Sequence, residues 1–264
     1  MLISCNGMIR SGSTLQYNLV KGIVEHAALG VGQGFLPQHD LPLLEKQIFD
    51  WASHDDLHVV KTHVMLPYTE NMLSKGDIKV CYIYRDIRDV AVSVKLKFKR
   101  ADKELLEILD NAISLYYKIL SLDNVVVQKY EDVSSDLLGA ASLLASQLGL
   151  NVSHTDLVEI SQDCSISSAK KKLETIKSHS QFRAAIVSFL RKAGLAKIVK
   201  KLLPHFPFLS SFSQAYDRST LLHPSHISKN SGASGLWRTQ LSTDEAEMLT
   251  KRYERWLKET GYIS

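Results

Sequence analysis

The sequence predicts an α/β fold with a central parallel sheet flanked by helices, and two observations lead to this prediction. Four short apolar runs are nearly continuous rather than alternating in polarity, as in strands buried on both faces. They lie at residues 2–5, 57–61, 79–84 and 124–130. Segments with helical patterning separate them, at 14–28, 41–53, 68–75, 88–98, 103–120 and 134–149. This alternation along the chain indicates βαβ units and a doubly wound sheet.

A last helix is expected at 243–259. Ser242 and Glu245 fit a capping box at its start, and Gly261 follows its end. The chain has 264 residues, of which 45% are hydrophobic, enough to bury a substantial core. We therefore expect a single domain over 1–264.

The segment 175–225 differs in composition from the rest of that domain. No acidic residue occurs between Thr175 and Ala215, whereas seven Lys and Arg do. Gly194 divides this basic stretch into two short helix-like pieces with apolar faces. We expect a helical flap over an active site. Contact of the basic amphipathic stretch 181–203 with an anionic membrane surface is the alternative.

Composition and charge narrow the function classes. The formal net charge of +4 is too small to indicate nucleic-acid binding, although it suits a small polyanionic ligand. No apolar run approaches the ~20 residues of a membrane span, and the N-terminus does not resemble a signal peptide, so a cytoplasmic protein is expected. The three cysteines lack a C-x-x-C pair, and no metal-ligand cluster is apparent. Oligomeric state stays open.

A loop suited to phosphate follows the first predicted strand. It reads Gly7-Met-Ile-Arg10-Ser11-Gly12-Ser13-Thr14 and leads into a helix. Such a turn directs backbone amides and the positive end of the helix dipole at one point. A Walker A loop would need Lys where Ser13 stands, which disfavours nucleoside-triphosphate chemistry. A plain turn between strand and helix is the alternative.

Lys61-Thr62-His63 follows the second predicted strand. Imidazole is the side chain best suited to accept a proton near neutral pH, and a nearby ammonium can neutralise a developing negative charge. From the residues alone, a structural histidine remains the alternative.

The third strand ends at Arg85, and Ser93 lies eight residues further on. A guanidinium and a hydroxyl at this edge of the sheet could hold a terminal phosphate together. An ordinary ion pair of Arg85 with Asp86 or Asp89 is the alternative.

In these three loops the sequence resembles the sulfotransferases that use 3′-phosphoadenosine-5′-phosphosulfate (PAPS). Residues 10–14 fit their 5′-phosphosulfate loop, K/R-S-G-T/S-T, and residues 61–63 match their K-T-H. Residues 85–93 match their 3′-phosphate motif, R-N/D-x-x-D-x-x-x-S, at every fixed position. The resemblance implies a P-loop-like fold, His63 as general base, and contacts of Lys61 and Arg10 with the reacting group. It also implies cofactor binding by Arg10, Ser11, Gly12, Ser13, Thr14, Arg85 and Ser93.

Further matches are shorter. Tyr130 begins a Y-E-D sequence that lies near the nucleotide in the family, and Ser165 is what remains of an adenine-side T-S-F. Gly232 begins G-x-x-G-x-W-K/R, which closes over the 3′-phosphate, but Asn230-Ser231 replace the usual basic pair before it, so Lys229 is the expected cation. Leu15 replaces a tryptophan that packs against adenine.

The resemblance implies that the sulfuryl group of PAPS is transferred in line to a hydroxyl or amine of a small-molecule acceptor, such as a secondary metabolite. The product is 3′,5′-bisphosphoadenosine (PAP), and no metal is required. The identity of the acceptor stays open. Two other classes remain, namely a nucleoside or small-molecule kinase and a non-catalytic, membrane-peripheral anion-binding protein.

Overall fold

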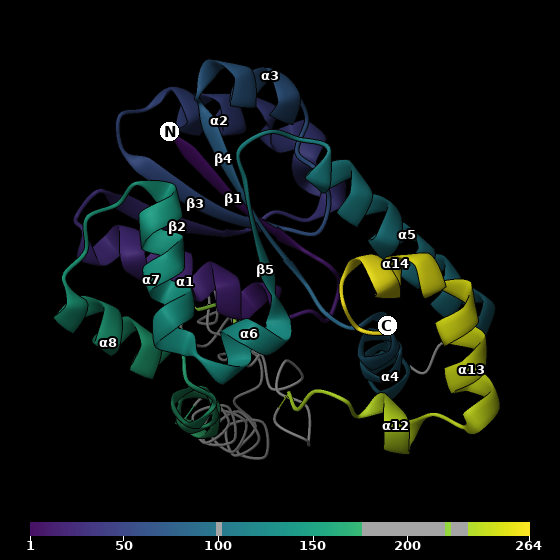
Figure 1. The fold of residues 1–264 in the computed structure, drawn as a ribbon. Helices are drawn as coiled ribbons and strands as arrows, with labels where there is room; N and C mark the ends of the chain where they lie inside the picture. The colour runs from purple at the N-terminus through teal and green to yellow at the C-terminus, as the bar shows by residue number, and fades with distance from the viewer. Residues whose placement is uncertain (99–101, 176–219, 223–231) are drawn as a thin grey trace, which may run out of the picture.

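The computed structural model of the chain describes residues 1–98, 102–175, 220–222 and 232–264. Its centre is a parallel sheet in the order β2-β3-β1-β4-β5 (Figure 1). The strands are β1 Leu2–Gly7, β2 Gly30–Phe35, β3 Leu57–Thr62, β4 Ile78–Tyr84 and β5 Val125–Lys129. The four predicted strands and their parallel arrangement are confirmed. All six residues of β1 are buried, which explains its uninterrupted apolar run.

The edge strand β2 was not predicted. Its sequence, GVGQGF, contains three glycines, a residue type that is depleted in strands. The glycine at position 30 is required by close packing, because a Cβ there would lie 1.9 Å from the carbonyl oxygen of Leu57. The strand pairs with β3, with a register shift between Gly32 and Gly34. Tertiary packing, rather than local propensity, therefore makes this segment a strand.

One face of the sheet is covered by the helix that follows the phosphate loop and by three later helices. They are α1 Ser13–His26, α6 Tyr130–Ser135, α7 Leu137–Leu148 and α8 His154–Asp163. Ile3 of β1, Ile23 of α1 and Leu144 of α7 belong to one buried cluster on this face.

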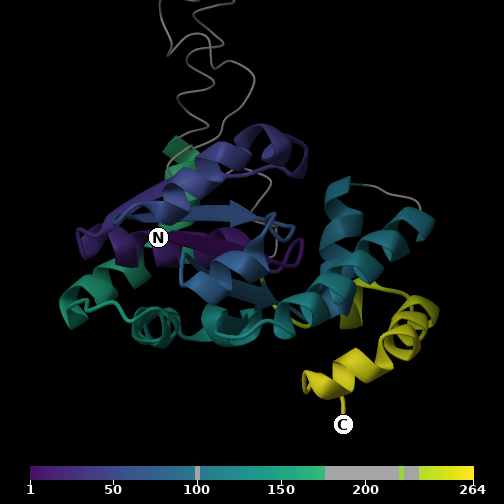
Figure 2. The same cartoon turned by 90° about the horizontal axis from the view of Figure 1, so that it is seen from above.

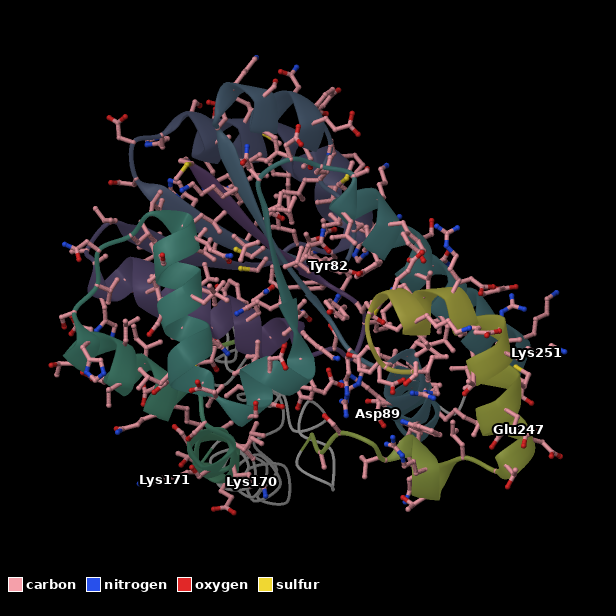
Figure 3. All side chains as sticks on the ribbon, viewed as in Figure 1. Tyr82, Asp89, Lys170, Lys171, Glu247 and Lys251 are labelled. Carbon is pink, nitrogen blue, oxygen red and sulfur yellow. The ribbon has the colours of Figure 1, made fainter. Side chains whose placement is uncertain are left out.

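The opposite face is covered by α2 Leu41–Ser53, α3 Thr69–Lys75, α4 Ile87–Phe98 and α5 Asp102–Leu120, with the C-terminal helices α13 Thr243–Arg252 and α14 Glu254–Glu259. Both views place α13 and α14 beside α5 (Figures 1 and 2). Tyr82 of β4 lies inside this second cluster (Figure 3). In the same cluster the ring of Tyr116 packs 5.5 Å from that of Trp256. Two cores on opposite faces confirm the flanked sheet.

Several helix boundaries differ from those expected. The segment 134–149 is divided at Asp136, whose carboxylate accepts a hydrogen bond from the Gly139 amide at the start of α7. The helix expected at 243–259 is interrupted at Tyr253, although its capping box of Ser242 and Glu245 is confirmed. Helix α8 and a helical stretch over 166–175 were not predicted. A four-residue helix, α12 (Trp237–Gln240), and a 3-10 turn, η1 (Gln38–Asp40), complete the described elements.

The topology fixes where a ligand can bind. Strands β3 and β4 lie on either side of β1, so the chain reverses its direction across the sheet at this point. In open α/β sheets, ligands bind beyond the carboxyl ends of the strands at such a reversal. Most of the expected flap, 175–225, lies outside the described residues, as do the basic stretch 181–203 and Lys229.

Candidate functional site

The loop between β1 and α1 is held by buried contacts. Gly12 has φ +87°, and a Cβ at this position would lie 2.5 Å from a ring carbon of Tyr130. Ser11 is fully buried, and its hydroxyl contacts the carbonyl oxygens of Met8 and Ile83 at 2.7 and 3.0 Å. The hydroxyl of Ser11 therefore shapes the loop, whereas Gly12, Ser13 and Thr14 line a cavity at the start of α1.

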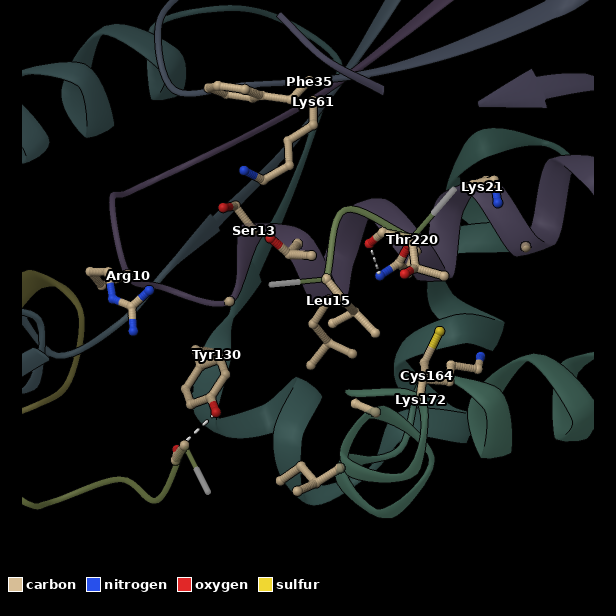
Figure 4. Close-up of a pocket in the computed structure, with 18 of the residues that line it drawn as sticks. Arg10, Ser13, Leu15, Lys21, Phe35, Lys61, Tyr130, Cys164, Lys172 and Thr220 are labelled. Atoms are coloured by element: carbon tan, nitrogen blue, oxygen red, sulfur yellow. Dashed lines mark hydrogen bonds between the residues drawn. The ribbon is translucent and has the colours of Figure 1, made fainter. Parts of the chain in front are cut away.

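That cavity has a volume of about 570 Å³ and runs from the strand ends along α1 to α8 (Figure 4). Ten of the residues singled out from the sequence line it, namely Arg10, Gly12, Ser13, Thr14, Lys61, His63, Arg85, Ser93, Tyr130 and Gly232. Ser11 and Ser165 lie outside the lining, and Lys229 falls outside the described residues. The fold thus brings the three separate loops to one cavity.

His63 is oriented by the loop before α1. Its Nδ1 lies 3.1 Å from the carbonyl oxygen of Gly7, and because a carbonyl can only accept, Nδ1 carries the proton in the neutral ring. Nε2 then holds the lone pair and accepts from the ammonium of Lys61 at 3.2 Å. Burial and the charge of Lys61 lower the pKa of His63 to about 4, so the ring is neutral at pH 7.

Lys61 is buried beside an aromatic wall. Its ammonium lies 4.6 Å from the ring centroid of Phe35, whose ring also meets that of His63 edge-on at 5.6 Å. Burial, followed by the charge of Lys97, lowers the pKa of Lys61 to about 8. Phe35 lies on the unpredicted β2, so no sequence pattern indicated its place in the site.

Asn6 is a second residue that the sequence analysis missed. This buried side chain accepts from the Gly7 amide and donates to the carbonyl oxygen of Val64, both at 2.9 Å. It joins the end of β1 to the loop that carries His63. An Asn at the end of an apolar strand, where a buried amide needs several partners, was the available signal.

Arg85 is 6% exposed, and its guanidinium faces the cavity. Nη2 donates to the carbonyl oxygen of Ala233 at 2.7 Å and pairs with Asp89 at 3.4 Å, while the Tyr130 ring lies 4.5 Å from Cζ. Within the described residues, the buried Nε has no acceptor. An unsatisfied buried donor of a charged group costs about 1–3 kcal/mol or more, so a ligand that accepts from it would be favoured.

Arg10 lies next to this site. Its Nε donates to the hydroxyl of Ser93 at 2.8 Å, which joins the phosphate loop to α4. Burial is the largest cause that lowers the pKa of Arg10, and the positive charge of Arg85 is the second largest. Two guanidinium groups that line one cavity, with the charge of one lowering the pKa of the other, favour a bound anion.

Asp86 and Asp89 face away from the cavity and hold its frame. The Asp89 carboxylate accepts from the amides of Gly235 and Trp237 at 2.6 and 3.0 Å (Figure 3). Asp86 pairs with Arg88 at 2.8 Å, and the Arg88 guanidinium stacks 3.8 Å from the Trp237 ring. These contacts, with that of the Tyr130 hydroxyl to the Gly232 carbonyl at 2.8 Å, fix the segment 232–237 against Arg85.

The far end of the cavity, toward α8, combines apolar side chains with two ion pairs. Leu15, Cys164, Ile166 and Ala169 line it, together with Leu222 from the short described stretch 220–222. Burial raises the pKa of the Cys164 thiol to about 12. Ser165 instead accepts a hydrogen bond from the Ser168 amide at 3.2 Å, at the start of the helical stretch 166–175.

The cavity is electrically asymmetric. Its two lining carboxylates in the described residues, Glu25 and Asp163, lie at the far end and pair with Lys21 and Lys172 at 3.4 and 3.6 Å. At the strand ends the charged lining groups are cationic, namely Arg10, Lys61, Arg85 and Lys97. This arrangement suits a ligand that carries several negative charges at one end.

The fold also assembles three residues of metal-ligating type, which the sequence analysis did not find. His26, Asp156 and Glu159 place ligand atoms within 4.8 Å of one another on α1 and α8. His26 and Glu159 are exposed, and His26 with Asp156 forms a 3.5 Å surface ion pair. The ion pair of His26 with Asp156 is sufficient to explain why these three residues lie together. Within the described part of the chain, no helix is sufficiently long and apolar to cross a membrane.

Comparison with known proteins identifies the family. A family model described as "Sulfotransferase domain" matches residues 5–207. The solved structure of mouse sulfotransferase SULT7A1 complexed with PAP is similar, with a TM-score of 0.60 and 14% sequence identity, over 97% of this chain and 84% of that one. No curated protein sequence matches significantly.

Two structures of retinol dehydratase are also similar. The complex with retinol and PAP has a TM-score of 0.55 and 18% identity, over 98% of this chain and 80% of that one. The complex with androsterone and inactive cofactor PAP has a TM-score of 0.53 and 17% identity, with the same coverage of 98% and 80%. At these identities, the solved structures show a common fold.

Proposed function

Because the chain belongs to the sulfotransferase family, we propose that it transfers the sulfuryl group of PAPS to a hydroxyl or amine of a small-molecule acceptor. One observation carries the choice of cofactor. The buried Nε of Arg85 has no acceptor among the described residues, and Arg85 lines a cavity whose near end is lined by three further cations. A second phosphate on the nucleotide, at the 3′ position, would provide both the acceptor and the charge.

The chain's residues then divide between the two ends of PAPS. The amides at the start of α1, with the hydroxyls of Ser13 and Thr14, would hold the 5′-phosphosulfate beside Arg10. Arg85 would hold the 3′-phosphate, with Ser93 near Arg10 between the two groups. In the relatives named above, PAP occupies the complexes; its placement here rests on the residues of this cavity.

The adenine would lie among the apolar side chains of the far end. Tyr130, Leu15, Cys164 and Ile166 line the route toward it. Lys229, outside the described residues, and Gly232 complete the proposed cover of the 3′-phosphate, and Ser165 stays a predicted neighbour of the base. PAPS would supply a sulfuryl group whose sulfur an acceptor can attack, with PAP as the leaving group.

In the proposed reaction, the acceptor oxygen or nitrogen forms a bond to sulfur while the bond from sulfur to the 5′-phosphate oxygen breaks, and PAP leaves. His63 takes the acceptor proton at Nε2, since its Nδ1 proton is held by Gly7. Lys61 and Arg10 neutralise the charge on the departing oxygen and the sulfuryl oxygens. Positioning and charge stabilisation supply most of the catalysis in such transfers.

The low pKa of His63 fits this order of events. A base with a pKa of about 4 is weak in the free protein because the site is buried and carries the charge of Lys61. Bound anions offset that positive charge and raise the pKa of the imidazole toward neutral pH. Base strength would therefore develop only after the cofactor has bound.

A transfer assay with radiolabelled PAPS and an acceptor library tests the proposal. We expect labelled product with the wild type and losses on the order of 10²–10³ in rate for His63→Ala and for Lys61→Met, the usual effect of removing one preorganised group. PAP binding by the His63→Ala protein is the folding control. Near-full turnover of His63→Ala at neutral pH would contradict the role of His63 as the base.

The two other classes are separated by direct measurements. In a thermal-shift comparison, PAP stabilises a sulfotransferase, whereas ATP with magnesium stabilises a kinase. Co-sedimentation with anionic vesicles tests the membrane-peripheral alternative, which depends on the basic stretch 181–203 outside the described residues.

A further inference from the structure

Lys97 lies in the cavity although no motif included it. It follows Ser93 by four residues on α4, so both side chains project from the same face of the helix. Lys97 lines the cavity together with His63 and Lys61. Within the described residues no carboxylate pairs with its ammonium, which lies 5.2 Å from the ring centroid of the neighbouring Phe98.

The charge of Lys97 acts on the catalytic end of the cavity. Burial is the largest cause that lowers the pKa of Lys61, and the charge of Lys97 comes second, ahead of that of Arg10. The charge of Lys97 also lowers the pKa of His63. Lys97 is itself affected by burial and then by Arg10. Together with the shared lining of the cavity, these effects indicate that the Lys97 ammonium acts on the region where an acceptor must approach the base.

The charges of the cofactor are already matched by other residues. The proposed function assigns Arg10, Lys61 and the amides of α1 to the 5′-phosphosulfate and Arg85, with its unsatisfied Nε, to the 3′-phosphate. The two carboxylates among the described lining residues lie at the far end and pair with lysines there. Lys97 is therefore a surplus cation at the acceptor end, partly removed from water.

Two aromatic side chains flank this end. Phe35 and Phe98 both line the cavity and are 39% and 38% exposed. The Phe98 ring lies beside the ammonium of Lys97 and the Phe35 ring beside that of Lys61, so each presents an apolar surface next to a cation. A ring or apolar body could pack against them while a negative group contacts the lysine.

We propose that Lys97 binds an anionic group on the acceptor, so that this enzyme prefers small acceptors that combine an aromatic or apolar body with a carboxylate or another acidic group. The inference rests on the proposed function and names its acceptor class. An acidic acceptor would also offset the positive charge around His63, which strengthens the base at the moment of transfer.

Matched acceptors that differ only in charge test this. We would compare 4-hydroxyphenylacetate with 4-hydroxyphenylacetamide, and 4-(hydroxymethyl)benzoate with its amide, by kcat/KM for sulfate transfer. The wild type should prefer the carboxylate of each pair by at least about tenfold, as expected for one charge-assisted hydrogen bond. Lys97→Met should reduce this preference to about one, and Lys97→Arg should keep most of it.

The control is Lys95→Met on the same helix, because the Lys95 ammonium pairs with Glu245 and does not line the cavity. It should leave the preference unchanged. PAP affinity, measured by calorimetry, should stay within about threefold in all variants, since the proposal puts Lys97 outside the cofactor site.

Three results would overturn the inference. The wild type could transfer sulfate to the amides equally well or modify neutral acceptors only. The preference could survive in Lys97→Met, or Lys97→Met could lose as much PAP affinity as kcat/KM. Failure of the proposed function looks different, because the wild type would then neither bind PAP nor transfer sulfate to any acceptor.

Discussion

The guanidinium Nε of Arg10 donates a 2.8 Å hydrogen bond to the hydroxyl of Ser93, between residues 83 positions apart in the chain. Arg10 adopts φ +64°, a left-handed conformation that is uncommon outside glycine. The bond to α4 helps to hold the side chain of a strained loop residue over the cavity. The two signature loops thus form one unit before any ligand binds.

Ser93→Ala tests this unit. Loss of the hydroxyl leaves Arg10 without one partner, and we expect PAP to bind about 5–10-fold more weakly, the effect of one hydrogen bond of about 1–1.5 kcal/mol. Isothermal titration measures the affinity. Ser93→Thr keeps the hydroxyl and should bind PAP nearly as the wild type does; equal weakening in both variants would contradict the role of the bond.

Gly12→Ala should destabilise the protein more than the matched change Gly76→Ala. Both glycines have positive φ, +87° and +77°, but a Cβ at position 76 meets nothing within 4 Å, whereas one at position 12 meets Tyr130 at 2.5 Å. We expect a loss in the free energy of unfolding of about 1–2 kcal/mol at Gly76, and of at least about 3 kcal/mol at Gly12.

Chemical denaturation measures both values. The displaced Tyr130 should also weaken PAP binding in Gly12→Ala by at least about tenfold, since its ring packs against Arg85. Equal destabilisation at the two positions would show that the Tyr130 contact does not constrain the loop.

Asp89→Asn should loosen the segment 232–237. The Asp89 side chain is 1% exposed and accepts from two backbone amides as well as pairing with Arg85, and an amide side chain offers a single acceptor oxygen. We expect a loss of about 2–3 kcal/mol in the free energy of unfolding and faster hydrogen exchange over 232–240. Asp110→Asn is the control.

The Asp110 carboxylate pairs with Arg252 at the surface, where both side chains are more than 40% exposed. Its loss should cost at most about 1 kcal/mol. Unchanged exchange over 232–240 in Asp89→Asn would refute the anchoring role of the carboxylate.

Binding of PAP should take up protons at pH 8. Lys61 has a pKa of about 8, so it is about half protonated in the free protein at this pH, while the phosphates of PAP are already deprotonated. Bound anions raise the pKa of Lys61 and complete its protonation, with an uptake of about half a proton. Affinity should accordingly fall as the pH rises above 8.

Calorimetry in two buffers of different ionisation enthalpy measures this uptake. Lys61→Arg keeps the charge at all these pH values and should abolish most of it. The same uptake in Lys61→Arg would assign the proton to another group.

The sequence was sufficient for the parts of the fold that depend on local patterns. Continuous apolar runs predicted β1, β3 and β4, which are almost entirely buried, because a strand buried on both faces has no polar side. A similar run predicted the edge strand β5, although its residues are alternately buried and half-buried. The sequence was insufficient for β2, where close approach to Leu57 selects glycine. It was also insufficient for α8. The only signal for the start of this helix is the N-cap Ser153, which lies in a polar stretch.

The site shows the same division. Motif spacing was sufficient to select Arg10, His63, Arg85 and Ser93, which converge on one cavity because strand ends in a parallel sheet meet at one edge. Motifs did not distinguish Arg85, which lines the cavity, from Asp89, which is buried but does not line it. Residues such as Asn6 and Lys97 acquire their place through contacts between loops, which spacing along the chain does not encode.

The most direct test of the account is the contribution of the 3′-phosphate to binding, measured by calorimetry with PAP and with adenosine 5′-monophosphate, which lacks it. If Arg85 holds this phosphate, the wild type binds PAP at least about 100-fold more tightly, and Arg85→Gln reduces the ratio to less than about tenfold with little change for the monophosphate. A wild type that binds both nucleotides equally, or a ratio that survives in Arg85→Gln, would contradict the account.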